Sequence, residues 1–162
     1  MSLYSVVVPV YNSEHTLGEL YTRLEKVFRE TLKEDFELIL VDDGSKDRSF
    51  EVMKELREKD SRVKIIQMAR NFGQHPALLC GFSHAEGDFI ITMDDDLQHP
   101  PEEIPKLINT IRERDDVDVI IGVMHMDVDN EYGVYGSGVT DLANACPEFD
   151  VIVAAHGHKS IP

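Results

Sequence analysis

Hydrophobic runs of six or seven residues alternate along the chain with segments whose apolar residues recur every three or four positions. The runs are rich in Val and Ile, which is typical of buried parallel strands, and they predict strands over residues 4–10, 36–41, 63–68, 88–93 and 117–123. The segments between them predict amphipathic helices, whose starts we assign to Ser13, Asp47, Pro76 and Pro100.

This alternation predicts an α/β fold. We expect a three-layer αβα sandwich with a mostly parallel sheet and right-handed crossovers. The length of 162 residues suits one domain. In such a sheet, ligands bind outside the carboxyl ends of the strands. Those ends are therefore where we look for the chemistry.

The composition changes near residue 123. Residues 1–123 carry 25 acids and 15 bases, whereas residues 124–162 carry 6 acids, a single base and three of the seven His. A Gly-rich loop, a short helix near residues 140–145 and a last strand over 150–154 are predicted there. We therefore predict two parts, 1–123 and 124–162, that complete one compact sheet.

The charge balance narrows the classes of partner. The chain has 31 Asp and Glu against 16 Lys and Arg, for a net charge of -15, which excludes a basic nucleic-acid-binding module. No apolar run approaches the roughly 20 residues that span a bilayer, and no signal segment opens the chain. We expect a chain without a transmembrane segment and a cytoplasmic location.

Three consecutive acids, Asp94, Asp95 and Asp96, follow the fourth predicted strand. In extended backbone, Asp94 and Asp96 would point one way and Asp95 the other. Two carboxylates on one side suit Mg²⁺ or Mn²⁺, which take further ligands from phosphates. The alternative is an acidic loop solvated at the surface.

Other polar groups follow the remaining strands, and for most of them an ordinary structural role is the alternative to ligand binding. Asp42 and Asp43 can accept hydrogen bonds from a nucleobase or ribose, or can simply form a turn. Tyr11 can stack on a base or pack internally. Arg70 can bind a phosphate or form a surface ion pair. His125 follows the fifth predicted strand.

Four of these segments together resemble a known family. Residues 9–12, 41–45, 70–75 and 94–102 look like successive motifs of the inverting nucleotide-sugar glycosyltransferases with the GT-A (nucleotide-diphospho-sugar transferase, Rossmann-like) fold. The closest branch transfers sugars to polyprenyl phosphates. It includes dolichol-phosphate mannosyltransferases, bactoprenol glucosyltransferases and undecaprenyl-phosphate aminoarabinose transferases. The resemblance spans residues 4 to about 122.

The resemblance implies a nucleoside diphosphate sugar as donor, a polyprenyl phosphate as acceptor and full-length relatives at the cytoplasmic membrane face. It implies a Mg²⁺ or Mn²⁺ site at Asp94, Asp96 and Gln98, with catalytic roles for Asp95 and Asp96. The nucleotide-binding residues that we assign are Pro9, Tyr11, Asn12, Glu14, Asp42, Asp43, Arg70 and Asp94. An ionised acceptor phosphate needs positioning and electrostatic stabilisation rather than a strong base.

Residues 118–162 resemble a different family, the carboxyl half of a calcineurin-like metallophosphoesterase. There, His125, His156 and His158 would supply part of a two-metal site. The earlier ligand motifs of that family are absent from residues 1–117, so we expect a hybrid chain whose glycosyltransferase activity is incomplete. The alternatives are a metal-dependent phosphoesterase fragment and a chimeric fold without activity.

Overall fold

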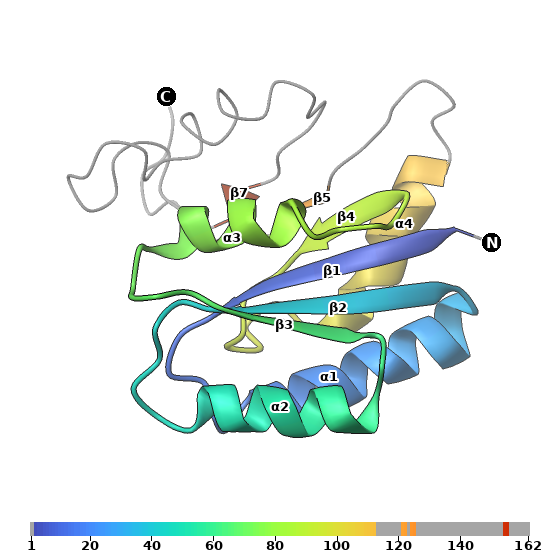
Figure 1. Cartoon of the computed structure of the whole chain (residues 1–162). Coiled ribbons are helices and arrows are strands. Elements are labelled where there is room, and N and C mark those ends of the chain that lie inside the picture. Colours follow the sequence, from blue (N-terminus) through green and yellow to red (C-terminus); the bar gives the residue numbers. More distant parts are fainter. Residues whose placement is uncertain (1, 113–120, 123, 126–153, 156–162) are drawn as a thin grey trace, which may run out of the picture.

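The computed structural model describes residues 2–112, 121–122, 124–125 and 154–155 (Figure 1). Strands and helices alternate in chain order, as the hydrophobic pattern predicts. The elements are β1 (Leu3–Val10), α1 (Leu17–Lys26), the π-helix η1 (Val27–Leu32), β2 (Asp35–Asp42), α2 (Ser49–Lys59), β3 (Val63–Gln67), α3 (Gln74–Phe82), β4 (Phe89–Thr92), the 3₁₀-helix η2 (Pro101–Glu103), α4 (Ile104–Arg112), β5 (Ile121–Gly122), β6 (Met124–His125) and β7 (Ala154–Ala155).

Five parallel strands form the main sheet in the order β3-β2-β1-β4-β5. β1 pairs with β2 along its whole length and with β4 over Tyr4–Val7. The chain first builds outward from β1 to β3 and then returns to place β4 on the other side of β1. This change of direction puts the topological switch point, where open α/β sheets bind ligands, between β1 and β4.

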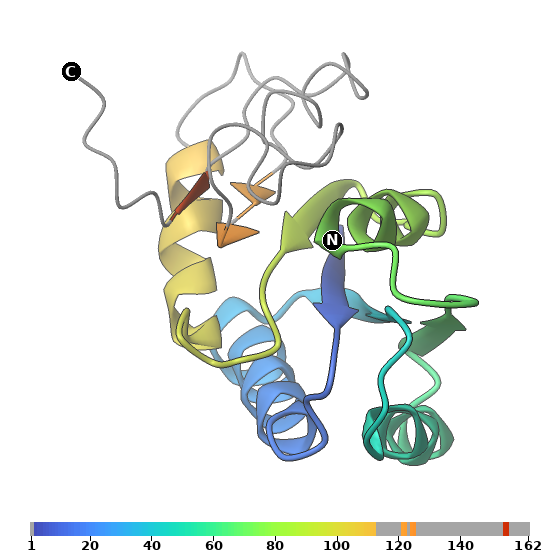
Figure 2. The ribbon, with the colours of Figure 1, turned by 90° about the vertical axis from the view of Figure 1, so that its left-hand side faces the viewer.

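Helices cover both faces of the sheet, which gives the three-layer sandwich (Figures 1 and 2). α3 lies on one face, while α1, α2 and α4 lie on the other. Alternate residues of the central strands supply the two cores, since Val6 and Val8 pack with the α1 side and Val7 packs with the α3 side. The predicted α/β sandwich is therefore confirmed.

The first helix begins later than predicted. Ser13 is not its N-cap, because α1 begins at Leu17 after Thr16. The Ser13 hydroxyl instead donates to the Asp95 carboxylate and also lies 3.2 Å from the Tyr11 carbonyl oxygen. A tertiary contact therefore outweighs the local capping preference of serine. The apolar stripe does continue to Leu32, as predicted, although its last residues form the π-helix η1.

The fourth strand ends earlier than predicted, at Thr92 rather than residue 93. Asp95 and Asp96 lie in a bend, and Leu97 has a positive φ of 63°. The expectation that Asp94–Asp96 continue in extended backbone is therefore wrong. The third helix also differs, because α3 begins at Gln74, two residues before Pro76.

Little of the region after residue 112 is described. β5 completes the main sheet through Ile91↔Ile121 and Thr92↔Gly122, inside the predicted fifth strand. β6 and β7 pair with each other in a separate two-stranded sheet. The predicted helix near 140–145 lies outside the described residues, and the two-part organisation at residue 123 stays a prediction. In the described part of the chain, no helix has the length and apolar character needed to span a membrane.

Candidate functional site at the carboxyl edge of the sheet

The four longest strands of the parallel sheet end at one edge, where their loops lie side by side (Figure 2). We call residues 11–14, 43–48, 68–73 and 93–100 the carboxyl-edge loops. Backbone hydrogen bonds of 2.9 Å join the first residue of two loops to the last residue of the neighbouring strand, from the Asp43 N–H to the Val10 carbonyl and from the Met68 N–H to the Asp42 carbonyl. The polar motifs that the sequence singles out therefore gather at this edge.

Asp42, the last residue of β2, is fully buried. Its carboxylate accepts hydrogen bonds from the Ser45 N–H (3.0 Å) and the Gln67 side-chain amide (3.3 Å). The turn that follows requires glycine, because Gly44 has a φ of +75° and a Cβ there would lie 2.7 Å from the Asn71 backbone nitrogen. The predicted turn at residues 42–45 is therefore present, and its glycine lets the second loop lie directly against the backbone of the third.

Asp43 is also buried and joins the second loop to the third. Its two carboxylate oxygens accept hydrogen bonds from the N–H groups of Phe72 (2.7 Å) and Gly73 (2.8 Å). Burial raises the pKa of Asp43, the two N–H donors partly offset this, and the nearby charge of Asp42 adds to the rise. Each oxygen keeps a further lone pair for a ligand.

Asn12 and Glu14 hold the first two loops together. The Asn12 side chain accepts from the Lys46 N–H (2.7 Å), and its own N–H donates to the Ser45 hydroxyl (3.0 Å). Glu14 accepts from the Arg48 N–H at 2.9 Å. Asn12 has a φ of +56°, a conformation that Asn tolerates better than most residues. Both side chains therefore build the edge, and their predicted contact with a nucleotide stays a prediction.

Two aromatic rings at this edge are exposed to solvent. Tyr11 is 44% exposed and Phe72 is 46% exposed. The Arg70 guanidinium lies over the Phe72 ring, 4.7 Å from its centroid. Among the described residues Arg70 forms no salt bridge, so its cation remains accessible on this stacked pair. The internal packing weighed for Tyr11 is not what the structure has.

The three acids after β4 turn toward different partners. Asp94 accepts a hydrogen bond from the Gln74 amide at the start of α3 (2.7 Å). Asp95 accepts from the Tyr11 N–H (3.0 Å) and from a hydroxyl of the same loop. Asp96 accepts from the Gln98 N–H within its own loop (2.9 Å). Each of the three carboxylates thus has a different protein donor, and the charge of Asp96 still acts to raise the pKa of Asp95.

These acids have neutral partners. Asp42, Asp43, Asp95 and Asp96 form no salt bridge with any Lys, Arg or His in the described ranges. Burial raises the pKa of Asp95, although hydrogen bonds from the first loop oppose the rise. Among the described residues, these four carboxylates therefore have no salt-bridge partner, although Lys46, Arg48 and Arg70 lie in the carboxyl-edge loops.

The donors available for a metal are hard oxygens. Within the described residues, no group of three or more His, Cys, Asp or Glu side chains is placed to hold an ion. The predicted ligands Asp94, Asp96 and Gln98 offer two carboxylates and one amide oxygen from a single loop. Mg²⁺ and Mn²⁺ commonly use one or two carboxylates with phosphates and water, so this donor set fits them.

Two other groups of predicted site residues lie elsewhere. Pro9 is buried inside β1, opposite Val41 of β2, where it forms part of the sheet. His125 lies in β6 opposite Ala155. His156 and His158 lie outside the described residues, and the histidine site stays a prediction.

Several contacts at this edge were not predicted from the sequence. The hydroxyls of Ser13, Ser45 and Ser49 bond across loops, with Ser49 accepting from the Ser13 N–H at 2.7 Å. The side-chain amide of Gln74, the first residue of α3, donates a hydrogen bond to Asp94. The available signal was the presence of small polar residues in each loop after a strand.

The parallel α/β sheet agrees with a nucleotide-diphospho-sugar transferase (GT-A) fold, which glycosyltransferases of solved structure share. The model for the family described as "Glycosyl transferase family 2" matches residues 5–154. The chain therefore belongs to glycosyl transferase family 2, and the predicted glycosyltransferase branch is confirmed.

Curated relatives point to one activity. The chain is 43% identical over 144 residues to undecaprenyl-phosphate 4-deoxy-4-formamido-L-arabinose transferase of Pseudomonas paraeruginosa, covering 88% of the chain and 42% of that protein. It is 49% identical over 114 residues to the Proteus mirabilis protein of the same name, covering 70% of the chain and 35% of the relative. The chain thus spans less than half the length of these relatives.

Solved structures share the fold. S. aureus TarS 1-349 in complex with UDP-GlcNAc has a TM-score of 0.60 and 30% identity, and the match covers 83% of this chain and 37% of that TarS fragment. Glucosyl-3-phosphoglycerate synthase from Mycobacterium tuberculosis, in complex with Mn²⁺, UDP and glucosyl-3-phosphoglycerate, has a TM-score of 0.52 and 26% identity, covering 68% and 39%. The neighbours thus hold nucleotides, and one also holds a divalent metal.

One family model matches the sequence on both sides of the junction predicted near residue 123. It continues past residue 123 to residue 154, and the Pseudomonas relative aligns with 88% of the chain. The likeness of residues 118–162 to a metallophosphoesterase is not shown by these comparisons and stays a prediction.

Proposed function

We propose that this chain is the nucleotide-sugar-binding part of a glycosyltransferase that moves a sugar from a nucleoside diphosphate to a polyprenyl phosphate. The observation that carries the proposal is the acidic carboxyl edge, where buried Asp42, Asp43 and half-buried Asp95 have neutral donors for partners. Such an edge favours a divalent cation, and a diphosphate supplies that cation's remaining ligands. The named activity of the curated relatives supports the choice of reaction.

The donor nucleoside is assigned to the first three loops. The exposed Tyr11 ring offers a stacking surface for a base. Asp43 keeps lone pairs for ribose hydroxyls or base N–H groups, and its two backbone donors fix the carboxylate in place. Asp42 is fully buried and contributes by fixing the turn after β2 through the Ser45 N–H. Arg70, held over Phe72, supplies a cation for the diphosphate. These groups are held in place by Asn12 and Glu14, which bond to the backbone of the second loop, and by Pro9 within β1.

Asp94, Asp96 and Gln98 would hold Mg²⁺ or Mn²⁺. When bound, the metal neutralises negative charge on the departing nucleoside diphosphate. Gln74 fixes the Asp94 carboxylate by a 2.7 Å hydrogen bond, which orients it before substrate arrives. The Mn²⁺ and UDP in the M. tuberculosis neighbour support a divalent cation as the metal.

In the transfer itself, an oxygen of the acceptor phosphate attacks the anomeric carbon of the sugar. The bond between that carbon and the diphosphate breaks, and the electron pair leaves with the nucleoside diphosphate. Since the acceptor phosphate is already ionised at neutral pH, no residue of the edge has to remove a proton from it. The chain's contribution is orientation and electrostatic stabilisation.

The acceptor places the reaction at a membrane surface. Polyprenyl phosphates are lipids, and we assign the activity to the cytoplasmic face, where nucleotide sugars are available. The described residues supply the donor side of the site, so we expect this chain to bind the nucleotide while acceptor binding depends on segments that the longer relatives carry.

Isothermal titration of the chain with UDP, with and without Mn²⁺, tests the proposal. We expect binding that requires the metal and is weakened at least tenfold in Asp96→Ala. Glu58→Gln, which removes one negative charge from the exposed face of α2, is the matched control and should bind like the wild type. Failure to bind UDP or GDP with saturating Mn²⁺ would contradict the proposal.

The second candidate is a phosphoesterase fragment that uses His125, His156 and His158. The observation favouring it is the parallel pairing of β6 with β7, in which His125 lies opposite Ala155, the residue before His156. Hydrolysis of a generic phosphate ester, abolished in His156→Ala, would support this candidate. If the chain neither binds nucleotide nor hydrolyses the ester, the remaining hypothesis is a chimeric fold without activity.

A further inference from the structure

The backbone hydrogen bonds between β1 and β4 stop short of the end of β1, which continues to Val10. The last hydrogen bond runs from the Met93 N–H to the Val7 carbonyl at 3.2 Å. In a parallel ladder, the next bond would be donated by residue 9. Pro9 has no N–H, so the ladder cannot continue. The two loops at the topological switch point therefore separate without backbone hydrogen bonds to join them.

The side chain of Asp95, in the loop after β4, bonds to the loop after β1. One carboxylate oxygen of Asp95 accepts hydrogen bonds from the Tyr11 N–H, at 3.0 Å, and from the Ser13 hydroxyl. Tyr11 and Ser13 flank Asn12, whose positive φ marks the sharp turn of the first loop. Asp95 therefore fixes both ends of this turn.

The neighbouring acids have other partners. Asp94 bonds to Gln74 and Asp96 bonds to the Gln98 N–H. Asp95 bonds to the first loop, through Tyr11 and Ser13. One oxygen of the Asp95 carboxylate, Oδ2, accepts from both Tyr11 and Ser13. The two hydrogen bonds together hold the first loop against the loop after β4.

We propose that Asp95 is a positioning residue that fastens the Tyr11–Ser13 turn to the acidic loop, so that the nucleoside and metal sides of the site form one preorganised unit. This inference rests on the proposed function for its consequence in binding. It replaces the catalytic role that the resemblance implies for Asp95. Preorganisation lowers the ordering cost of binding a ligand that contacts both loops.

The chemistry of the contact allows a sharp test with two substitutions. Asp95→Asn keeps an oxygen that can accept from both donors but removes the charge, whereas Asp95→Ala removes the acceptor. We expect Asp95→Ala to weaken metal-dependent UDP binding about 10- to 100-fold and Asp95→Asn to weaken it less than about threefold. If both variants weaken binding equally, the charge rather than the hydrogen bonds matters and the proposal is overturned. Glu58→Gln again controls for the loss of one charge.

A second measurement does not depend on nucleotide. Amide hydrogen exchange at Tyr11 should accelerate about 10-fold or more in Asp95→Ala and stay near the wild-type rate in Asp95→Asn. Unchanged exchange in Asp95→Ala would overturn the proposed clamp.

The two assays separate the two proposals. If the wild type fails to bind UDP while Tyr11 exchange responds as expected, the proposed function fails and the clamp stands. A double-mutant cycle with Ser13→Ala completes the test. Because both residues act through one contact, the Asp95→Ala and Ser13→Ala effects on exchange should be less than additive. Full additivity would contradict the contact.

Discussion

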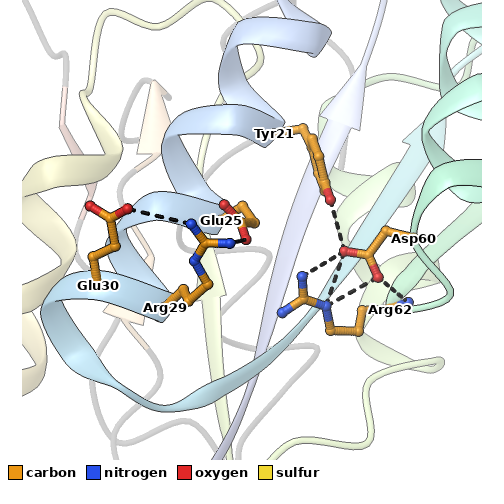
Figure 3. Close-up of polar contacts among 6 residues, drawn as sticks. All are labelled: Tyr21, Glu25, Arg29, Glu30, Asp60 and Arg62. Atoms are coloured by element: carbon orange, nitrogen blue, oxygen red, sulfur yellow. Dashed lines mark hydrogen bonds and ion pairs between the residues drawn. The ribbon is translucent and has the colours of Figure 1, made fainter.

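Acidic side chains at the two ends of the parallel sheet have different partners: cations at the amino end and neutral amides at the carboxyl end. At the amino end, Asp60 bonds to the Arg62 guanidinium at 2.7 Å and accepts from the Tyr21 hydroxyl at 2.9 Å (Figure 3). Buried Glu37 lies 2.7 Å from the ammonium of Lys64. At the carboxyl end, the buried acids of β2 and its loop have amide donors instead.

Asp60 at the amino end and the acids Asp43 and Asp95 at the carboxyl end therefore respond to pH in opposite directions. Hydrogen bonds from Arg62 lower the pKa of Asp60 to about 2, so its contribution to stability is present above the unfolded value of 3.8 and is lost as pH falls through about 2. Burial raises the pKa of Asp43 and of Asp95. Their stabilising contribution is present below the unfolded value and is lost as pH rises through the folded pKa. The amino end is thus organised for stability, while the carboxyl end retains charge for a ligand.

Removing the cation at the amino end should have the largest effect. Lys64→Met leaves Glu37 buried, with the Ser5 hydroxyl and the Glu86 N–H as its remaining donors. Burial acts to raise the pKa of Glu37, and the Lys64, Ser5 and Glu86 hydrogen bonds together lower it. We expect the free energy of unfolding, measured in urea, to fall by about 2–4 kcal/mol.

Two further variants control this measurement. Lys54→Met removes an exposed lysine that lies 3.6 Å from Glu51, and it should cost under about 0.5 kcal/mol. Adding Glu37→Gln to Lys64→Met should recover part of the loss, because the unpaired charge is gone. Equal effects of the two lysine substitutions would contradict the contrast between buried and exposed pairs.

Breaking the Asp60 network should have a smaller, pH-dependent effect. The shift of its pKa from 3.8 to about 2 corresponds to roughly 2.4 kcal/mol, which we reduce to about 1–2 kcal/mol because Arg62 is 38% exposed. Asp60→Asn should lose this amount at pH 7 and progressively less below pH 4. Urea denaturation of both proteins at pH 7, 4 and 2.5 checks the prediction. A stability difference that is constant across this range would contradict it.

The sequence predicts the fold better than it predicts the helix starts. Runs such as residues 38–41 within the predicted strand 36–41 are apolar on both faces, so they predict buried parallel strands regardless of the tertiary context. The start of α1 depends on that context, since Asp95 draws the Ser13 hydroxyl away from the helix. Local propensity could not reveal a contact between residues 82 positions apart.

The same limit applies to the candidate site. Motif order and the parallel sheet predict that Asp42, Asp43 and the acids after β4 share an edge. Their orientations could not be predicted, because the bend at Asp95 and the positive φ of Leu97 replace the extended backbone. Asn12 carries a side chain suited to a ligand, yet it bonds to the backbone of the second loop.

Adding a divalent cation should act on the carboxyl end alone. Mg²⁺ at about ten times its dissociation constant would stabilise the chain by about 1.4 kcal/mol, which raises the melting temperature by roughly 3–6 °C. NaCl at the same ionic strength should give a smaller shift, and Asp94→Ala/Asp96→Ala should remove the Mg²⁺ effect. An unchanged melting curve at saturating Mg²⁺ would contradict a metal site at these residues.

The smallest effect should come from an exposed ion-pair cluster beside the amino-end network. Arg29 lies 3.1 Å from Glu25 and 3.5 Å from Glu30, and its side chain is 66% exposed (Figure 3). Arg29→Gln should change the free energy of unfolding by less than about 0.5 kcal/mol, because solvent screens such pairs. The comparison with Asp60→Asn in one urea series isolates burial as the cause. A loss above 1 kcal/mol would mean that charge pairing stabilises this end regardless of burial.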